Sequence, residues 1–230
     1  MINPSNNARK RSYEIDLLRG LAIVLMVIFH FSYDLTVFGW ADFSTSKDIE
    51  WIIFRAVIVS SFLLAVGMSS YSAYQKSVNK NKLIKSVSKL FAVSMFITLG
   101  SFFMHPNAWV YFGIIHFVTV ALPISVLFVR APYIALIIGI GCFVGFWSGI
   151  LNLYPVWQWS VSNLGIPSRT VDLVSFFPWI CVFFFGVFFF HIVLFLFIFN
   201  TISILDFFVF FFLHSFFFFF FLFPILLFLF

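Results

Sequence analysis

The chain has 230 residues, of which 63% are apolar and 9% are charged. A water-soluble domain is roughly half apolar and about a quarter charged, so this composition excludes a soluble globular domain and indicates an integral membrane protein. The net charge of +5 comes from basic residues between apolar segments. It therefore indicates membrane topology and attraction to anionic lipid, and it does not indicate nucleic-acid binding.

Seven apolar segments are candidates for membrane-spanning helices, since a span needs about 20 mostly apolar residues. They are expected at about 16–38, 51–74, 88–104, 109–129, 133–153, 176–199 and 207–230. The sequence thus predicts an all-α, polytopic transmembrane helix bundle with about seven spans. We expect one transmembrane domain over residues 13–230, preceded by a basic tail at residues 1–12.

Lysine and arginine residues are concentrated on alternate connections between these segments. The basic positions are Arg9, Lys10, Arg11, Lys76, Lys80, Lys82, Lys85, Lys89 and Arg130. By the positive-inside rule, these connections and the amino terminus are expected to be cytoplasmic. The segment at 154–175 then belongs to the outer face, and its Trp157 and Trp159 are typical of the membrane interface.

The last part of the chain is dominated by phenylalanine. Of the 40 phenylalanines, 23 lie between Phe183 and Phe230, six of them in an unbroken run. Such a low-complexity segment still inserts favourably into a bilayer. It is interpreted as a pair of apolar helices with little functional content, or as a degenerate stretch of the gene.

The first apolar segment carries four ionisable residues, Asp16, Arg19, His30 and Asp34. An ionisable group near the bilayer centre costs at least roughly 2.5 to 3.5 kcal/mol, so each one is a candidate for function. Their spacing places all four on one side of a helix. Arg19 and His30 are about 16 Å apart along the helix axis, with Arg19 near the cytoplasmic surface and His30 beyond the midplane.

His30 and Asp34 stand one helical turn apart. At this spacing a carboxylate can orient an imidazole and raise its basicity, as a general base requires. The alternative is that Asp34 lies at the interface and His30 is merely hydrogen-bonded. Both interpretations remain open on spacing alone.

Arg55 and His116 are further candidates, because both are expected on helices that can approach His30. The alternatives are that Arg55 extends to the outer headgroups and that His116 is a hydrogen-bonded packing residue. His105 is expected to face solvent. His191 and His214 lie in the phenylalanine-rich region and are given no role.

Several well-known catalytic and binding motifs do not occur in the sequence. There is no phosphate-binding G-x-x-x-x-G-K loop, no H-E-x-x-H pair, no C-x-x-C and no nucleophile elbow. Cys142 and Cys181 stand singly in apolar segments, with no metal-ligand or disulfide spacing. No metal ion and no permanently bound cofactor are predicted.

Three stretches together resemble a family of membrane acyltransferases. Asp16, Arg19, Gly20 and Ala22 form a D-x-x-R-G-x-A pattern, and His30 follows Arg19 by 11 residues. The stretch at 113–117 is similar to the G-I-L-H-F stretch of that family. Asp172, followed by Phe177-Pro178-Trp179, is similar to its D-x-x-P-x-F-P-W segment. The family is that of the bacterial relatives of heparan-alpha-glucosaminide N-acetyltransferase, and the resemblance runs from about residue 13 to 186.

This resemblance implies transfer of an acetyl or other acyl group from cytoplasmic acyl-coenzyme A to an acceptor at the outer face. The implied acceptor is a sugar amine or hydroxyl on a glycan or glycolipid, and the implied location is a bacterial inner membrane. Asp16 and Arg19 would bind the donor. His30 and Asp34 would carry out the chemistry, His30 acting either as a base or as an acyl-accepting nucleophile.

Further site candidates within the same resemblance are Arg55, His116, Asp172 and Trp179. The competing interpretations are a non-enzymatic membrane protein, such as a transporter or a structural bundle, and a haem-binding electron carrier using His30 and His116.

The carboxyl-terminal end departs from the pattern of the family, whose last helix resembles H-S-L-x-I-Y-L-x-H-Q-P-I-L. His214-Ser215 and Pro224-Ile225-Leu226 match this frame, whereas Phe219, Leu222 and Phe223 stand at its Tyr, His and Gln positions. If those polar groups contact the substrate, the activity of this chain is expected to be impaired.

Overall fold

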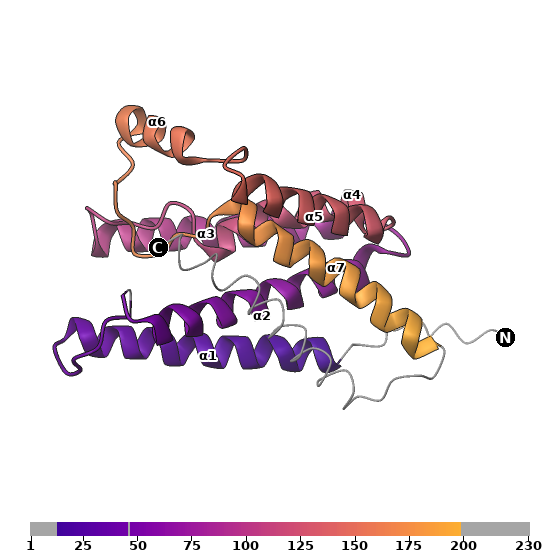
Figure 1. Ribbon diagram of the computed structural model, residues 1–230, viewed down its shortest axis with the longest axis horizontal. Coiled ribbons are helices and arrows are strands. Elements are labelled where there is room, and N and C mark those ends of the chain that lie inside the picture. The colour runs from indigo at the N-terminus through magenta and orange to yellow at the C-terminus, as the bar shows by residue number, and fades with distance from the viewer. Residues whose placement is uncertain (1–12, 46, 199–230) are drawn as a thin grey trace.

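The computed structural model describes residues 13–45 and 47–198, and this part of the chain is all-α. Figure 1 shows the arrangement of its seven helices. They are α1 (Tyr13–Val37), α2 (Ile49–Tyr74), α3 (Lys80–Met104), α4 (Ile114–Phe128), α5 (Pro132–Trp147), α6 (Tyr154–Leu164) and α7 (Phe176–Ile198).

Four helices of the described chain, α1, α2, α3 and α7, are long and apolar enough to cross a membrane, and α4 and α5 are shorter apolar helices of 15 and 16 residues. The prediction of an all-α membrane protein is therefore confirmed. At 1.5 Å per residue α4 is about 22 Å long, less than the roughly 30 Å of the hydrocarbon core. The expected span at 207–230 lies outside the described residues. Six of the described helices correspond to the other expected spans, and the remaining one, α6, has 11 residues and matches none of them.

Two of the expected boundaries differ from the structure for local reasons. The third helix begins at Lys80 because Asn79 caps it, its side-chain oxygen accepting a hydrogen bond from the Lys82 amide at 3.0 Å. Hydropathy alone excluded this basic first turn. The expected span at 133–153 ends earlier, at Trp147, and is followed by Gly149 with φ +77°.

The segment at 154–175, which was expected to lie at the outer interface, contains α6. Pro155 stands in its first turn, where its missing N–H costs nothing. Gly165, with φ +67°, ends it in a left-handed conformation. Figure 1 shows α6 set apart from the other helices.

The core lies where α7 crosses α2. A Cβ atom added to Gly67 would overlap the carbonyl oxygen of Phe183, and one added to Gly186 would stand 2.5 Å from the carbonyl oxygen of Leu64. The two backbones are therefore in direct contact, as small residues allow in membrane helix pairs. α7 also packs on α5, where an added Cβ on Gly139 would lie 3.3 Å from Phe184 Cβ. These three helices form the frame on which the others are placed.

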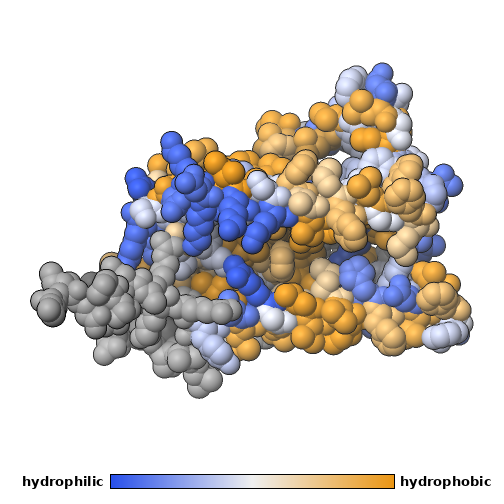
Figure 2. Space-filling model, turned by 180° about the vertical axis from the view of Figure 1, so that it is seen from behind, coloured by the Kyte–Doolittle hydropathy of each residue, from blue (hydrophilic) through white to orange (hydrophobic). Residues whose placement is uncertain are grey.

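Of the remaining helices, α1 lies along α2, and α3 lies along α4, which also contacts α2, α7 and α5. The connections at 38–45 and 47–48, at 105–113 and at 148–175, the last of which contains α6, gather at one end of the bundle. The exposed lysines at 76–89 are at the opposite end, where Figure 2 shows hydrophilic side chains gathered. The bundle thus has a basic end and a loop-rich end, as the alternation of basic connections predicts.

Candidate functional site

A cavity of about 700 Å³ lies between α1, α2, the first turn of α4 and the loop segment 171–174. Its charged and polar lining side chains are His30, Asp34, Arg55, His116 and Asp172, and Trp179 of α7 also lines it. The structure therefore brings six of the eight predicted site residues to one cavity near the loop-rich end. Within the described chain, Asp16 and Arg19 are not among its lining residues.

Asp172 is held in place by its backbone neighbours. The Val171 amide donates to the carbonyl of Ala108 at 2.9 Å, and the Val174 amide donates to the carbonyl of Phe112 at 3.1 Å. The segment at 170–174 thus runs beside the segment at 108–112, with a parallel bridge between Phe112 and Leu173. This pairing fixes Asp172 next to the start of α4.

The Asp172 carboxylate lies against the amino-terminal end of α4, where it accepts a hydrogen bond from the backbone N–H of Ile114. A helix amino terminus favours a negative charge. An added Cβ on Gly113 would be 2.7 Å from Asp172 Oδ2, so only glycine at this position lets the carboxylate approach the helix so closely. Gly113 is therefore part of the site through its lack of a side chain.

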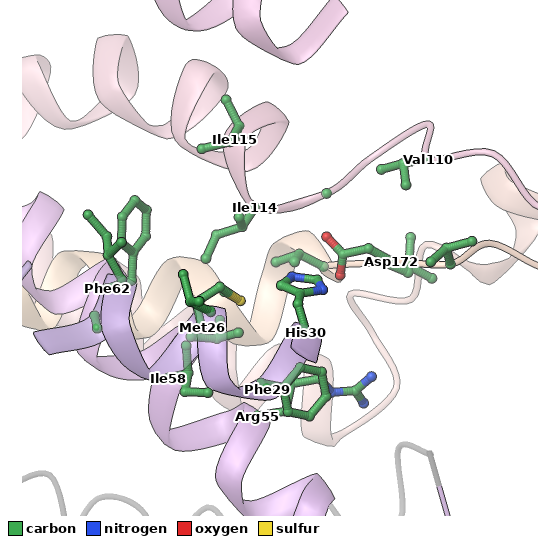
Figure 3. A pocket seen from close by; sticks show the side chains of 18 of the residues that line it. Met26, Phe29, His30, Arg55, Ile58, Phe62, Val110, Ile114, Ile115 and Asp172 are labelled. Carbon is green, nitrogen blue, oxygen red and sulfur yellow. The ribbon is translucent and has the colours of Figure 1, made fainter. Parts of the chain in front are cut away.

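Burial raises the pKa of the Asp172 carboxyl, while Arg55, His30, the Ile114 N–H and His116 act in the opposite direction. Figure 3 shows the carboxylate facing the ring of His30 across the cavity, with Arg55 on the neighbouring helix. One carboxylate from a loop and an imidazole from α1 thus face each other, and the guanidinium from α2 acts on the same carboxylate electrostatically. His30 and Asp172 are therefore candidates for a histidine–carboxylate pair.

His30 is exposed in the cavity and makes an edge-to-face contact with Phe29, with ring centroids 6.0 Å apart. Asp34 lines the same cavity and is exposed. Among the described residues, no hydrogen bond joins His30 to Asp34. The predicted pairing with Asp34 stays a prediction, and Asp172 is a second carboxylate that faces the same ring.

His116 is buried and held through both ring nitrogens. The Gly113 amide lies 3.2 Å from Nδ1, and Thr98 Oγ1 lies 2.9 Å from Nε2. Because a backbone N–H can only donate, Nδ1 must accept, and the proton is assigned to Nε2. The Thr98 hydroxyl in turn donates a hydrogen bond to the carbonyl of Val110 at 3.0 Å.

This network favours the packing interpretation of His116 and leaves neither of its ring nitrogens for an iron atom. The geometry therefore gives no support to a haem held between His30 and His116. In the part of the chain that the structure describes, no group of three or more His, Cys, Asp or Glu side chains is placed to hold a metal ion.

Arg19 and Asp16 form a separate polar group closer to the basic end. Arg19 Nη1 lies 3.7 Å from Asp16 Oδ1, and the two side chains are 39% and 31% exposed. Both donor binding and simple anchoring of the helix remain compatible with this ion pair. Along α1, it is about 16 Å from His30.

Sequence reasoning missed the role of Thr98 and gave Gly113 no role of its own. Thr98 is a polar residue in an apolar helix, a signal of an internal hydrogen bond that was available but not used. His191, given no role, packs α7 onto α2, with Nδ1 2.7 Å from the Tyr71 hydroxyl. That contact joins two helices whose neighbourhood could not be predicted from the sequence.

Comparison with known proteins adds one finding. The family model described as "Heparan-alpha-glucosaminide N-acetyltransferase, catalytic" matches residues 11–196, which is most of the chain and includes every residue that lines the cavity. No curated protein and no solved structure matches the chain.

Proposed function

Because the chain belongs to the family of heparan-alpha-glucosaminide N-acetyltransferase catalytic domains, we propose that it is a membrane-bound acyltransferase that uses acyl-coenzyme A. It transfers an acetyl or other acyl group to an amine or hydroxyl, most simply that of a sugar. The observation that carries this proposal is the meeting of His30 and Asp172 in a cavity between helices.

His30 acts as the general base of the reaction. It accepts a proton from the acceptor amine or hydroxyl while that atom bonds to the thioester carbonyl carbon. When the carbon–sulfur bond breaks, the imidazolium returns the proton to the departing thiolate of coenzyme A. The proton and the electron pairs therefore balance with no further reactant.

Asp172 orients the imidazole and stabilises the positive charge that it gains. Arg55, on the next helix, attracts the same carboxylate electrostatically and opposes the rise in its pKa that burial causes. Transfer through an acyl-histidine remains the alternative path for the same residues. In either path, a single histidine nitrogen accessible from the cavity is needed.

The basic end of the bundle faces the cytoplasm, and the end that holds His30 faces the outside. The distribution of lysine and arginine supports this orientation, which suits the inner membrane of a bacterium. Arg19, paired with Asp16, binds a donor phosphate at the inner end through its two parallel N–H groups. The acyl group is carried from there toward His30.

The proposal is tested with purified protein in lipid nanodiscs, acetyl-coenzyme A and glucosamine, following release of the coenzyme A thiol and acetylated product by mass spectrometry. Calorimetric titration of coenzyme A into wild type and Arg19→Lys belongs to the same experiment. Loss of a charged hydrogen bond costs on the order of 1.5 to 3 kcal/mol, so the affinity of the variant should fall by roughly 10- to 150-fold.

Failure to bind coenzyme A in the wild type would overturn the acyltransferase proposal and favour a transporter or structural protein. Binding with equal affinity in wild type and Arg19→Lys would overturn only the role of Arg19. The anchoring interpretation predicts that result, because an anchor needs only a positive charge on a long side chain.

A further inference from the structure

We infer that the acceptor is an amphiphile of the outer leaflet, a polar head carrying the amine or hydroxyl and an alkyl chain that lies along α1 in the cavity. This rests on the proposed function and names the class of its acceptor. The basis is the division of the cavity into a polar end and an apolar part, together with its opening along α1.

The polar side chains of the cavity are gathered toward the loop-rich end, and the rest of the wall is apolar. The apolar lining of the inner part is Ala22, Ile23, Met26, Val27, Ile58, Val59, Phe62, Ile97 and Ile115. Figure 3 shows Met26, Ile58 and Phe62 on one side of His30, and Asp172 on the other. A sugar chain in this part would leave its hydroxyl groups without partners, at a cost in free energy, whereas an alkyl chain would gain from contact.

In the part of the chain that the structure describes, the wall that α1 contributes is continuous with the exposed apolar surface of the bundle. Ile23, Val27 and Phe31 line the cavity, yet 55%, 63% and 62% of their surface is exposed. α1 packs along α2, whereas α3 packs along α4. An alkyl chain in this cavity can therefore extend sideways into the bilayer, and a volume of about 700 Å³ is of the size that accommodates ligands.

The direction of this polarity favours the acceptor over the acyl donor as the source of the chain. A lipid in the outer leaflet has its head at the interface and its chain directed toward the midplane. The lining of the cavity has the same order, polar at Asp34 and apolar at Ile23. At 1.5 Å per residue the distance between these two residues is about 16 Å. The coenzyme A part of the donor is polar and enters from the opposite end, while the alkyl chain leaves the cavity sideways past α1 and not toward Arg19.

The test uses acetyl-coenzyme A in nanodiscs with glucosamine and with butyl, octyl and decyl glucosaminides. Burying one methylene is worth about a fourfold gain in affinity, so kcat/KM should rise along the series and exceed that for glucosamine. Partition of longer chains into lipid also raises the apparent kcat/KM, but it does so equally for every variant. The decisive quantity is therefore the decyl-to-butyl ratio compared between variants.

The matched variants are Val27→Trp and Val24→Trp, one helical turn apart. Val27 lines the cavity, whereas Val24, 55% exposed, is not among the lining residues of the described chain. Val27→Trp fills the path of the chain and should lower the decyl-to-butyl ratio at least tenfold. Val24→Trp should keep both the ratio and the activity of wild type.

Equal ratios in wild type and Val27→Trp, with glucosamine acetylated, would overturn the amphiphile assignment and leave the acyltransferase proposal standing. A preference for decanoyl- over acetyl-coenzyme A, with no preference among acceptors, would assign the apolar wall to the donor. That result would also overturn the amphiphile assignment. If no acceptor is acetylated although acetyl-coenzyme A binds, the proposed function itself fails.

Discussion

Two histidines line the same cavity, and their surroundings differ. His30, on α1, is exposed in the cavity and faces the carboxylate of Asp172. His116, on α4, is buried, and both of its ring nitrogens lie within hydrogen-bonding distance of partners that belong to the α3–α4 hairpin. Lining the cavity therefore does not by itself distinguish a histidine that takes part in the reaction from one that stabilises the fold.

The difference shows how one histidine can support the other. The His116 network fixes Thr98 and Gly113 at the junction of α3 and α4. Gly113 and the Ile114 amide in turn form the surface against which Asp172 lies. His116 thus holds the platform of the carboxylate, and the carboxylate faces His30. We expect substitutions at the two histidines to affect different properties.

The largest effect is expected for His30→Ala. General base catalysis contributes typically 10²- to 10⁴-fold, so kcat should fall by about 10³-fold. The exposed ring makes few packing contacts, so the thermal midpoint and the affinity for coenzyme A should stay close to those of wild type. Acetyl transfer and thermal unfolding of the same preparation measure both. Full turnover in this variant would remove His30 from the chemistry.

A smaller effect should separate the two carboxylates of the cavity. Asp172→Asn keeps an oxygen that can accept from Ile114 but loses the charge, so kcat should fall by about 10- to 100-fold, by analogy with the loss of a group that orients a histidine ligand. Asp34→Asn is the matched variant one turn from His30, and we expect less than a threefold change. Steady-state kinetics of the two variants compares them. The reverse order would restore Asp34 as the partner of His30 and reduce Asp172 to a cap of α4.

Much of the helical framework follows from the sequence, because long apolar runs leave few alternatives in a membrane. The second span was expected at 51–74, and α2 runs from Ile49 to Tyr74. The length of α4 was not predictable in this way. Residues 109–112 are apolar like the helix that follows, but their backbone pairs with the segment before α7. Hydropathy cannot distinguish an apolar helix from an apolar extended segment.

The site was predictable to the extent that its residues are ionisable groups in an apolar chain. His30, Arg55 and His116 were found on that ground, and Asp172 was found by resemblance. The approach of Asp172 to His30 was not predictable, because that carboxylate comes from a distant loop. Local spacing could point only to Asp34, one turn away on α1, and that pairing stays a prediction.

The smallest effect on catalysis is expected for His116→Leu, which should act on stability instead. The change leaves the Gly113 amide without its acceptor and removes a partner of Thr98. Hydrogen bonds between membrane helices are worth about 0.6 to 2 kcal/mol, and a buried donor left unsatisfied costs about 1 to 3 kcal/mol, so the free energy of unfolding should fall by about 1 to 3 kcal/mol. The kcat of the folded fraction should fall only a few-fold, through a looser Asp172.

His191→Leu is the matched control for this last variant, since its ring also joins two helices, through Tyr71, but lies away from the cavity. It should lower stability to a similar degree and leave kcat unchanged. Denaturant titration in detergent, with turnover measured per folded molecule, tests both variants. If His116→Leu stays folded and loses activity as completely as His30→Ala, then His116 takes part in the chemistry directly, and its two hydrogen bonds must open during turnover.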